Sequence, residues 1–542
     1  MAEEAEAPER ADGFVFKQHS VKIRYKRDQE TRIGSLKPLD TAILEATRLA
    51  QEPAPKRARG RRASGAQADE GAELVGVEEA VCFTGAAVQS LHWLPHLLPG
   101  TAHATSSAPQ ASHALLAASL SSARDLSIVI GDKVDGAGVI QLWTVASAAS
   151  VPAGFTAPSG AAPHGDATSP LRLVHSINHA DGVAWGVRWR PGPPDAPLDL
   201  AAAHSSHAIA VYRVTGGDPR DGAAWSSRVL TRSMRAGQVG CKPSSIAWLD
   251  RAPYDVFAVG GWDGSFMLFR LRCAAAGSAP EDAALEGLLR VKADKQAIRS
   301  VCWLPDLRRQ GGESGGAGAA DATPGLPRGA VLSVAGDSSQ MTLWDMQNCF
   351  VPLVRLPAPS RAWTRDHCWA TRPYVAALMA QDDGKAVAVI SKSSEEVSNP
   401  KDARSHVMID GDTLGSANAI DVSGDGRTVL VAGEDGEAFV FEIQDILSRG
   451  RNRSKITPVA WQRWTGRALQ LGGRPRRSVD VQAMRFLRAP ARKPPEAAPG
   501  VGGMPWDCEV VLCAKWGPEV EGQGTWLALA GRAGLIRFIL HE

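Results

Sequence analysis

From about residue 77 onward, short apolar runs alternate with turn residues, a pattern typical of β-strands joined by tight connections. One phrase recurs in this region: an apolar strand that ends near an aromatic or large apolar residue just before a turn. It occurs at 87–95, 182–191, 243–250, 296–306 and 480–487. We expect each of these segments to form a strand.

A second phrase follows the first nearly every time. Apolar residues alternate on both sides of a short turn rich in Gly, Asp and Ser, which is the signature of a β-hairpin. The copies lie at 126–145, 198–214, 255–272, 330–346, 429–443 and 526–540, with a degenerate copy at 374–390. The chain is therefore expected to be all-β.

Hairpins repeated at this spacing predict a β-propeller. Seven blades over residues 76–542 fit the phrases best, and six or eight blades remain open. The last strand, Leu535 to Leu540, is expected to close the ring beside an early strand, which leaves no exposed sheet edge. Inserts rich in Ala, Gly, Pro and Ser near 149–170, 307–328 and 489–504 are expected to be loops.

The hairpin endings resemble those of the WD-repeat family. Leu343-Trp344-Asp345 is an unmodified WD ending, and Trp143, Tyr212, Phe269 and Phe441 occupy the matching aromatic position in other hairpins. The resemblance implies that each aromatic side chain packs between neighbouring sheets. Asp263, Asp337 and Asp435 follow the small-Gly element of three hairpins, where turn chemistry is favoured over a calcium site.

Residues 1–75 are polar and charged and predict a largely disordered N-terminal tail. LDTAILEATRLA at 39–50 is a candidate apolar helix. VKIRYKR at 21–27 alternates apolar and basic residues, so it is either an edge strand for a partner or an ordered piece of tail.

The tail also contains PKRARGRRAS at 55–64, whose basic residues are Lys56, Arg57, Arg59, Arg61 and Arg62. A nuclear address, a DNA contact and a solvated linker all fit such a run, and we favour the address. Arg59-Gly60-Arg61 resembles the AT-hook, which lies in the A/T minor groove, but Arg62 stands where that motif has proline.

A second basic run, at 448–478, contains no acidic residue and interleaves tryptophan with arginine. It is predicted to connect the last two blades on a propeller face, where it either contacts phosphate or a partner or forms a solvated loop with packed tryptophans. The candidate contact residues are Arg449, Arg451, Arg453, Lys455, Trp461, Arg463, Trp464, Arg474, Arg476 and Arg477.

Overall charge and cysteine usage narrow the possibilities further. The chain has 60 basic and 58 acidic residues, so a net charge of +2 provides no global attraction for nucleic acid or anionic membrane. The eight cysteines form no CxxC pair, which argues against a zinc or disulfide framework. Without an apolar signal segment or membrane span, we expect a soluble intracellular protein with reduced thiols.

Motifs for catalysis are absent from the sequence. It contains no phosphate loop, HExxH pair or GxSxG elbow. Asp366-His367-Cys368 comes nearest to a catalytic pair, but neighbours on a strand point to opposite faces. We therefore expect a protein that is not an enzyme and that needs no cofactor or metal.

Several segments, in order, resemble the WD-repeat subunit of general transcription factor IIIC. They are 181–191, 200–214, 246–271, 297–346, the Pro-containing link at 350–369, and 526–538. The resemblance implies a nuclear, non-catalytic scaffold that supports binding to internal promoters and RNA polymerase III transcription of tRNA and 5S rRNA genes. Its partners would be the other subunits of the complex, especially the largest, B-box-binding one, with DNA contacted indirectly or as an auxiliary and no membrane or small-molecule substrate.

Two other classes of protein remain as alternatives. One is a generic nuclear WD-repeat scaffold, such as a ubiquitin-ligase substrate receptor or a chromatin or ribosome-assembly factor, although Gln347 replaces the arginine of a cullin-type WDxR ending. The other is an enzyme that uses the central channel of the propeller, which requires converging titratable groups that the sequence does not reveal.

Overall fold

The computed structural model describes most of the expected strands. The described residues are 21–27, 30–36, 41–44, 79–84, 86–98, 113–121, 136–146, 171–216, 225–233, 242–272, 283–305, 329–338, 340–357, 362–370, 375–382, 386–391, 405–409, 416–434, 436–448, 460–463, 465–471, 474–480, 487–488, 510–520, 524–532 and 534–541. The three inserts near 149–170, 307–328 and 489–504 lie outside them. Within these ranges, no helix is long and apolar enough to cross a membrane.

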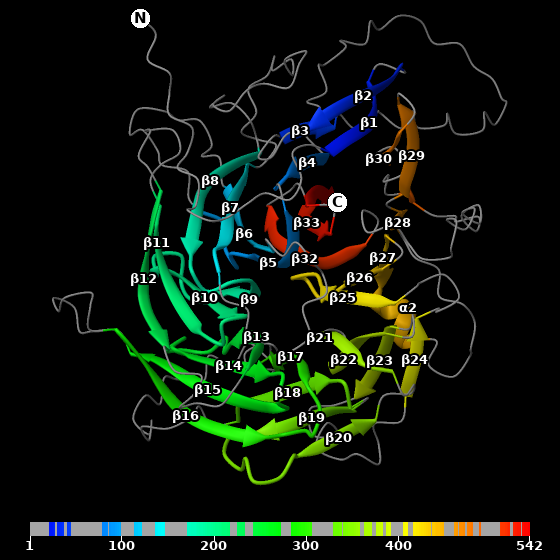
Figure 1. The fold of residues 1–542 in the computed structure, drawn as a ribbon. Coiled ribbons are helices and arrows are strands. Elements are labelled where there is room, and N and C mark those ends of the chain that lie inside the picture. The colour runs from blue at the N-terminus through cyan, green and yellow to red at the C-terminus, as the bar shows by residue number, and fades with distance from the viewer. Residues whose placement is uncertain are drawn as a thin grey trace, which may run out of the picture.

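Six of the sheets stand around a central axis, each with its first strand innermost (Figure 1). Three blades come from the first half of the chain. The first consists of β5 (Ala87–Trp93), β6 (His113–Ser121), β7 (Gly138–Ala146) and β8 (Leu171–His179). The second consists of β9 (Ala184–Trp189), β10 (Leu198–His204), β11 (Ile209–Thr215) and β12 (Ser226–Ser233). The third consists of β13 (Pro243–Trp248), β14 (Val256–Gly261), β15 (Ser265–Arg272) and β16 (Ala284–Lys292).

Three more blades follow in the same antiparallel order. The fourth consists of β17 (Ile298–Trp303), β18 (Val331–Gly336), β19 (Gln340–Asp345) and β20 (Val354–Pro357). The fifth consists of β21 (Thr364–Ala370), β22 (Val375–Gln381), β23 (Ala386–Ser391) and β24 (Ser405–Ile409). The sixth consists of β25 (Ala417–Val422), β26 (Thr428–Gly433), β27 (Glu437–Glu442) and β28 (Ala460–Arg463), and β31 (Leu487–Arg488) extends it. The short helix α2 (Ile443–Ser448) follows β27. These six blades confirm the all-β propeller, and six is within the range that the pattern allowed.

A composite sheet joins the two ends of the described chain. Its order is β3 (Thr41–Leu44), β4 (Glu79–Phe83), β34 (Leu535–His541), β33 (Gly524–Gly531) and β32 (Val511–Val520). Strand β34 pairs with β4 in antiparallel register, so the predicted closure beside an early strand is confirmed. Strand β32 contacts both β25 and β5, which completes the circle of inner strands.

A separate sheet combines strands from the predicted tail with strands from the second basic run. Its order is β2 (Glu30–Leu36), β1 (Val21–Arg27), β30 (Arg474–Asp480) and β29 (Thr465–Leu471). The VKIRYKR segment therefore pairs within its own chain, parallel to β30. Strand β3 also corrects a prediction, because Thr41–Leu44 is extended and pairs with β4 where we expected a helix over 39–50.

Two strand predictions were wrong in position. The partner of β7 is His113–Ser121, not the segment at 126–130, because the Ala- and Ser-rich β6 lacks the strong β-formers that mark a strand. The inner strand of the composite sheet is Val511–Val520, whereas we expected it at 480–487, ahead of the long insert.

The recurring aromatic residues lie between neighbouring sheets, as the WD resemblance implies. Trp143 packs with Trp526 and Phe538 of the composite sheet, and Trp344 packs with residues of β14 and β15. Tyr212, Phe269 and Phe441 occupy corresponding apolar clusters and are all buried. The core is thus a series of apolar layers, one at each junction of sheets.

A second tryptophan position connects the inner strands by hydrogen bonds. At the ends of β5, β13 and β17, the indole N–H donates to a backbone carbonyl on the preceding inner strand. The pairs are Trp93 with Lys515 (3.2 Å), Trp248 with Arg188 (3.0 Å) and Trp303 with Ala247 (3.0 Å). These bonds fix the height of one inner strand relative to the next.

Turns between the second and third strands use glycine where the backbone requires it. Gly264, between β14 and β15, has a φ of +80°, and a Cβ there would lie 2.4 Å from the carbonyl oxygens of Asp294 and Gln296. Only glycine fits this turn, because the left-handed backbone and the close approach both exclude a side chain.

The junction between the ring ends predicts one stability difference. Phe538 of β34 is fully buried and meets Trp93 edge to face, with ring centroids 5.9 Å apart. Phe538→Ala should lower the free energy of unfolding by about 3–5 kcal/mol, through lost burial and a residual cavity. Val229→Ala, on an exposed side chain of β12, should change it by less than about 0.5 kcal/mol. Chemical unfolding of both variants provides the test, and equal effects would contradict this view of the junction.

Candidate functional site

The inner strands bring one lysine and two aspartates together toward the centre of the ring, and we call these three residues the channel cluster. Lys515 Nζ of β32 lies 3.3 Å from Asp421 Oδ1 of β25 and 3.6 Å from Asp366 Oδ2 of β21. The three side chains are between 14 % and 20 % exposed. A single cation thus bridges two carboxylates that come from distant parts of the sequence.

The ion pairs keep Lys515 protonated, so the channel cluster is not arranged for proton transfer. Burial alone would lower the pKa of Lys515, but the carboxylates of Asp421 and Asp366 outweigh it and raise the pKa above its usual value. Asp421 is further held by the backbone N–H of Trp516, at 2.8 Å. A lysine kept protonated in this way is a poor base or nucleophile at neutral pH.

The cysteines on the inner strands β17, β21 and β32 also lack the properties of a reactive thiol. Burial raises the pKa of Cys302 and of Cys513 to about 12, and it raises the pKa of Cys368 well above its usual value. These thiols remain protonated at neutral pH, whereas a nucleophilic cysteine requires a thiolate. The sequence did not reveal that Lys515, Asp366 and Asp421 converge. Their arrangement is that of a structural ion-pair cluster.

The segment Asp366-His367-Cys368 is divided between two faces of β21, as strand alternation predicts. Asp366 faces Lys515, while His367 is buried with its Nε2 2.7 Å from Ser333 Oγ. Ser333 Oγ also donates to the carbonyl of Cys302 and accepts from Trp369 Nε1. The hydroxyl proton of Ser333 is used in the bond to Cys302, so His367 Nε2–H must donate to Ser333 Oγ. The network holds β17, β18 and β21 together.

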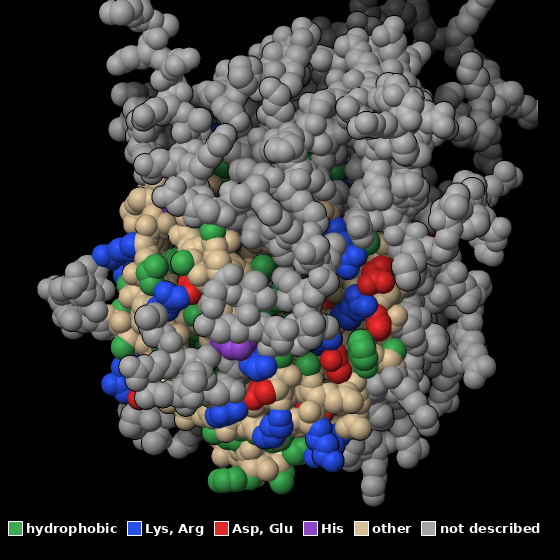
Figure 2. Space-filling view, viewed as in Figure 1, with side chains coloured by type: hydrophobic (Ala, Val, Ile, Leu, Met, Phe, Trp, Pro, Cys, Tyr) green, Lys and Arg blue, Asp and Glu red, His purple; other side chains and the backbone are tan. Residues whose placement is uncertain are grey.

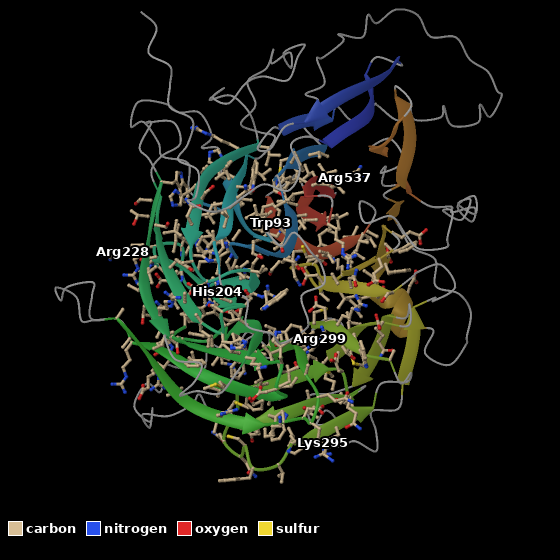
Figure 3. All side chains as sticks on the ribbon, in the orientation of Figure 1. Trp93, His204, Arg228, Lys295, Arg299 and Arg537 are labelled. Carbon is tan, nitrogen blue, oxygen red and sulfur yellow. The ribbon has the colours of Figure 1, made fainter. Side chains whose placement is uncertain are left out.

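A rim of aromatic and arginine side chains surrounds the channel on the face that carries the turns between second and third strands. Trp185 packs edge to face on Trp262, with ring centroids 6.1 Å apart. The Arg299 guanidinium lies over Trp262 at 4.6 Å and over Trp363 at 5.9 Å. It also forms two hydrogen bonds with Asp337, at 2.7 and 3.1 Å. Figure 3 shows Arg299 near the middle of the ring and Lys295 toward its lower edge.

Arg365 extends the rim to the next blades. Its guanidinium donates to Asp382, to Glu434 at 2.7 Å and to Asn418 at 2.6 Å. Asn418 in turn donates to the carbonyl of Val511 on β32. On the face shown in Figure 2, Lys and Arg side chains are accordingly interspersed with Asp and Glu rather than separated by sign.

The rim positions follow a rule that the sequence analysis missed. Trp185, Arg299, Arg365 and Asn418 are each the second residue of an inner strand. Residues that come directly after the second strand of a blade contact the first three of these side chains: Trp262 contacts Trp185, Asp337 contacts Arg299, and both Asp382 and Glu434 contact Arg365. Asn418 accepts from Arg365 as well. Aligning the blades strand by strand would have shown this pairing, but the inner strands β21 and β25, which carry Arg365 and Asn418, were not predicted.

The aspartates proposed for turn chemistry occupy different positions. Asp263 accepts a hydrogen bond from the backbone N–H of Ser265 at 3.1 Å, which is a turn role. Asp337 instead directly follows β18 and pairs with Arg299. Asp435 lies outside the described residues.

The link at 350–369 exposes apolar side chains at two places. Phe350 is 96 % exposed, with Val351 and Leu353 beside it in the connection between β19 and β20. Trp363, just before β21, is 46 % exposed. Apart from Val229, these are the large hydrophobic side chains that the described structure exposes.

Some of the residues predicted as contacts lie on described strands, and the others lie outside the described residues. Trp461 and Arg463 lie on β28, and Arg474, Arg476 and Arg477 lie on β30, so part of the expected loop is strand. The others lie outside the described residues: Lys56, Arg57, Arg59, Arg61, Arg62, Arg449, Arg451, Arg453, Lys455 and Trp464.

Comparison with known proteins gives a fold neighbour and no family. No protein-family model matches the chain, and no curated protein does so. Among solved structures, the chain is similar to the crystal structure of Saccharomyces cerevisiae Sqt1, with 12 % identity and a TM-score of 0.43, covering 84 % of this chain and 96 % of that one. At this identity, the function has to be argued from the site.

The buried His367 predicts a pH-dependent contribution to stability. Burial lowers its pKa to about 4, so below its unfolded value of about 6.5 the unfolded chain takes up a proton that the folded chain refuses. Stability should therefore fall as the pH drops from about 6.5 toward 4, by roughly 3 kcal/mol for this group. His367→Asn should flatten the pH dependence in that window, measured as the unfolding free energy at several pH values. The half-buried His175→Asn serves as the control, with a smaller change.

Proposed function

We propose that this protein is a non-catalytic docking platform and, more specifically, a scaffold subunit of a nuclear transcription factor IIIC assembly. The observation that carries the proposal is the exposure of Phe350 and Trp363 by the link at 350–369. This same link, in the sequence, resembles the corresponding part of the transcription factor IIIC subunit.

The exposed link has the composition of a protein-binding surface. Exposed large apolar side chains that gather in one segment mark interaction sites, and aromatic residues and arginine dominate the energetics of interfaces. Trp363 stands beside Arg299, whose guanidinium is already oriented by Asp337 and Trp262. A preorganised anchor of this kind loses little side-chain entropy on binding.

A basic sheet supports an auxiliary role near nucleic acid. The strands β1 and β30 lie side by side, with Lys22 opposite Ser478 and Arg24 opposite Asp480. Their sequences, VKIRYKR and RPRRSVD, together with Arg467 on the adjacent β29, concentrate positive charge in a chain of nearly balanced charge. Such a sheet suits phosphate contacts that position a complex without specifying sequence.

The chemistry of the channel supports a role without catalysis. The thiols of Cys302 and Cys513 stay protonated, because desolvation raises the pKa of each to about 12, and Lys515 is held in its ion pairs. We also infer that the composite sheet acts as a seventh blade, since its inner strand β32 contacts both β25 and β5.

A generic nuclear scaffold, such as a ubiquitin-ligase substrate receptor or a chromatin or ribosome-assembly factor, is the second candidate. It would use the same exposed link, so the partners distinguish the two functions. A tagged chain purified from nuclear extract should retain the other transcription factor IIIC subunits, foremost the largest one, identified by mass spectrometry. Recovery of cullin adaptors or ribosome-assembly factors in their place would refute the specific assignment.

Single substitutions in the link test the docking surface. Trp363→Ala and Phe350→Ala should each weaken retention of a direct partner by roughly ten- to a hundredfold if that residue is an interface anchor, without changing thermal stability. Val229→Ala is the matched control, because Val229 is 55 % exposed but lies on β12, away from the link. Retention that both link variants leave at the wild-type level would exclude this surface.

The basic segment at 55–64 has its own test. Replacing Arg57, Arg59, Arg61 and Arg62 by Ala should move a fluorescently tagged chain from the nucleus to the cytoplasm, because the receptor groove for such a run recognises its cations. A variant with four lysines at these positions keeps the charge and should remain nuclear. An unchanged distribution of the alanine variant would show that the segment is not the address.

A further inference from the structure

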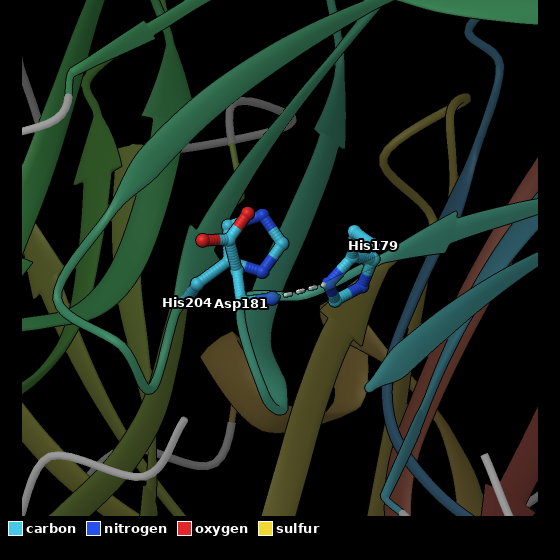
Figure 4. Close-up of side chains that lie close together, drawn as sticks. All are labelled: His179, Asp181 and His204. Atoms are coloured by element: carbon cyan, nitrogen blue, oxygen red, sulfur yellow. Dashed lines mark hydrogen bonds between the residues drawn. The ribbon is translucent and has the colours of Figure 1, made fainter. Parts of the chain in front are cut away.

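Two histidines and an aspartate meet where the blade of β5–β8 adjoins the blade of β9–β12. His179 is the last residue of β8, Asp181 lies in the connection to β9, and His204 ends β10 (Figure 4). One nitrogen from each imidazole and one carboxylate oxygen all lie within 4.8 Å of one another. The cluster spans two blades and shares no residue with the channel or the rim.

Each of the two histidines has one buried ring nitrogen without a hydrogen-bond partner. His204 is fully buried, and its Nε2 lies 3.2 Å from Tyr212 Oη, while its Nδ1 has no hydrogen-bond partner. His179 Nε2 is also buried without a partner, and its Nδ1 accepts only a long bond, 3.3 Å, from the backbone N–H of Asp181. Buried polar atoms normally have partners, so two unpaired imidazole nitrogens beside a carboxylate require an explanation.

The cluster contains ligand types that can coordinate a cation, and the present partner of its carboxylate is an arginine. Burial lowers the pKa of His179 to about 4 and that of His204 well below its usual value, so both rings are neutral at physiological pH. Asp181 is only 3 % exposed and is paired with Arg232, with Ser206 Oγ 3.2 Å from its Oδ1. Neutral imidazoles and an ionised carboxylate are the forms that coordinate a metal.

We propose that His179, Asp181 and His204 bind a divalent transition-metal ion of the zinc class and thereby fasten the two blades together. Two imidazoles and one carboxylate form a familiar three-ligand set for Zn²⁺, with water as the fourth ligand. His204 binds through Nδ1, and its Nε2–H donates to Tyr212 Oη, which orients the ring. Softer thiolate ligands are not part of the set, which favours nitrogen- and oxygen-binding metals.

Binding requires only local movement. Tetrahedral ligands at the usual zinc distances lie about 3.3 Å apart, so the three donor atoms must approach one another by at most about 1.5 Å. His179 would give up its long bond to the Asp181 backbone. Arg232, whose side chain is 35 % exposed, can turn outward as the metal replaces its charge.

Metal titration of the purified, chelator-treated full chain tests the proposal. Calorimetry with Zn²⁺ should give saturable binding of one ion per chain at this site, with a rise in melting temperature. His179→Gln and His204→Gln should each weaken that binding at least about a hundredfold, and Tyr212→Phe should weaken it about tenfold by freeing the ring of His204. His175→Gln is the matched control, because His175 lies on the same strand but bonds Ser227 outside the cluster.

Co²⁺ identifies the ligands directly. Substitution by Co²⁺ should give visible bands of a nitrogen- and oxygen-ligated site without the near-ultraviolet charge-transfer band of a thiolate. The proposal is overturned if the folded wild-type chain does not bind Zn²⁺ saturably, if both histidine variants bind like the wild type, or if the thiolate band shows cysteine ligands. The first and third outcomes need no variant, so misfolding of a substituted chain cannot obscure the result.

Discussion

Antiparallel pairing between β34 and β4 is the constraint on which the rest of the molecule depends. A circle of sheets that is not joined leaves a row of unpaired backbone groups at each end, which invites pairing with other chains. Here residues 79–83 and 535–539 share one sheet, so the circle cannot open without breaking the composite sheet. The channel cluster depends on the same closure, because Lys515 reaches Asp366 and Asp421 only when β32 stands between β25 and β5.

Within the closed circle, two kinds of tryptophan contact set the positions of the polar groups. Buried aromatic residues such as Trp143 fill the layers between sheets, and terminal residues such as Trp248 donate to the backbone of the preceding inner strand. The first contact is apolar and tolerates sliding, whereas the second is directional and fixes the register between blades. Side chains at the second position of an inner strand can therefore also reach groups beyond their own blade, as Arg299 reaches Trp363 and Arg365 reaches Glu434.

The sequence predicted the hairpins with glycine-containing turns and the closing strand, because local turn chemistry and alternation mark them. It did not predict β6, whose Ala- and Ser-rich sequence has little intrinsic β-preference, or the strand at Thr41–Leu44, where pairing with β4 overrides a helical pattern. The ion pair between Lys515 and Asp366 could not be foreseen, since only the completed circle brings the two residues together. Nor could the cluster of His179 and His204, because its residues come from two different blades.

The pairing of β3 with β4 also changes what the basic segment at 55–64 can do. Leu44 lies opposite Glu79, so residues 45–78 connect two positions that are paired with each other in the composite sheet. Arg61 is then at most roughly 60 Å from that point along a fully extended chain. A receptor or nucleic acid that binds this segment is thereby held at high effective concentration next to the ring closure. A single partner that bound both the segment and the propeller would gain affinity from this tether without any new contact.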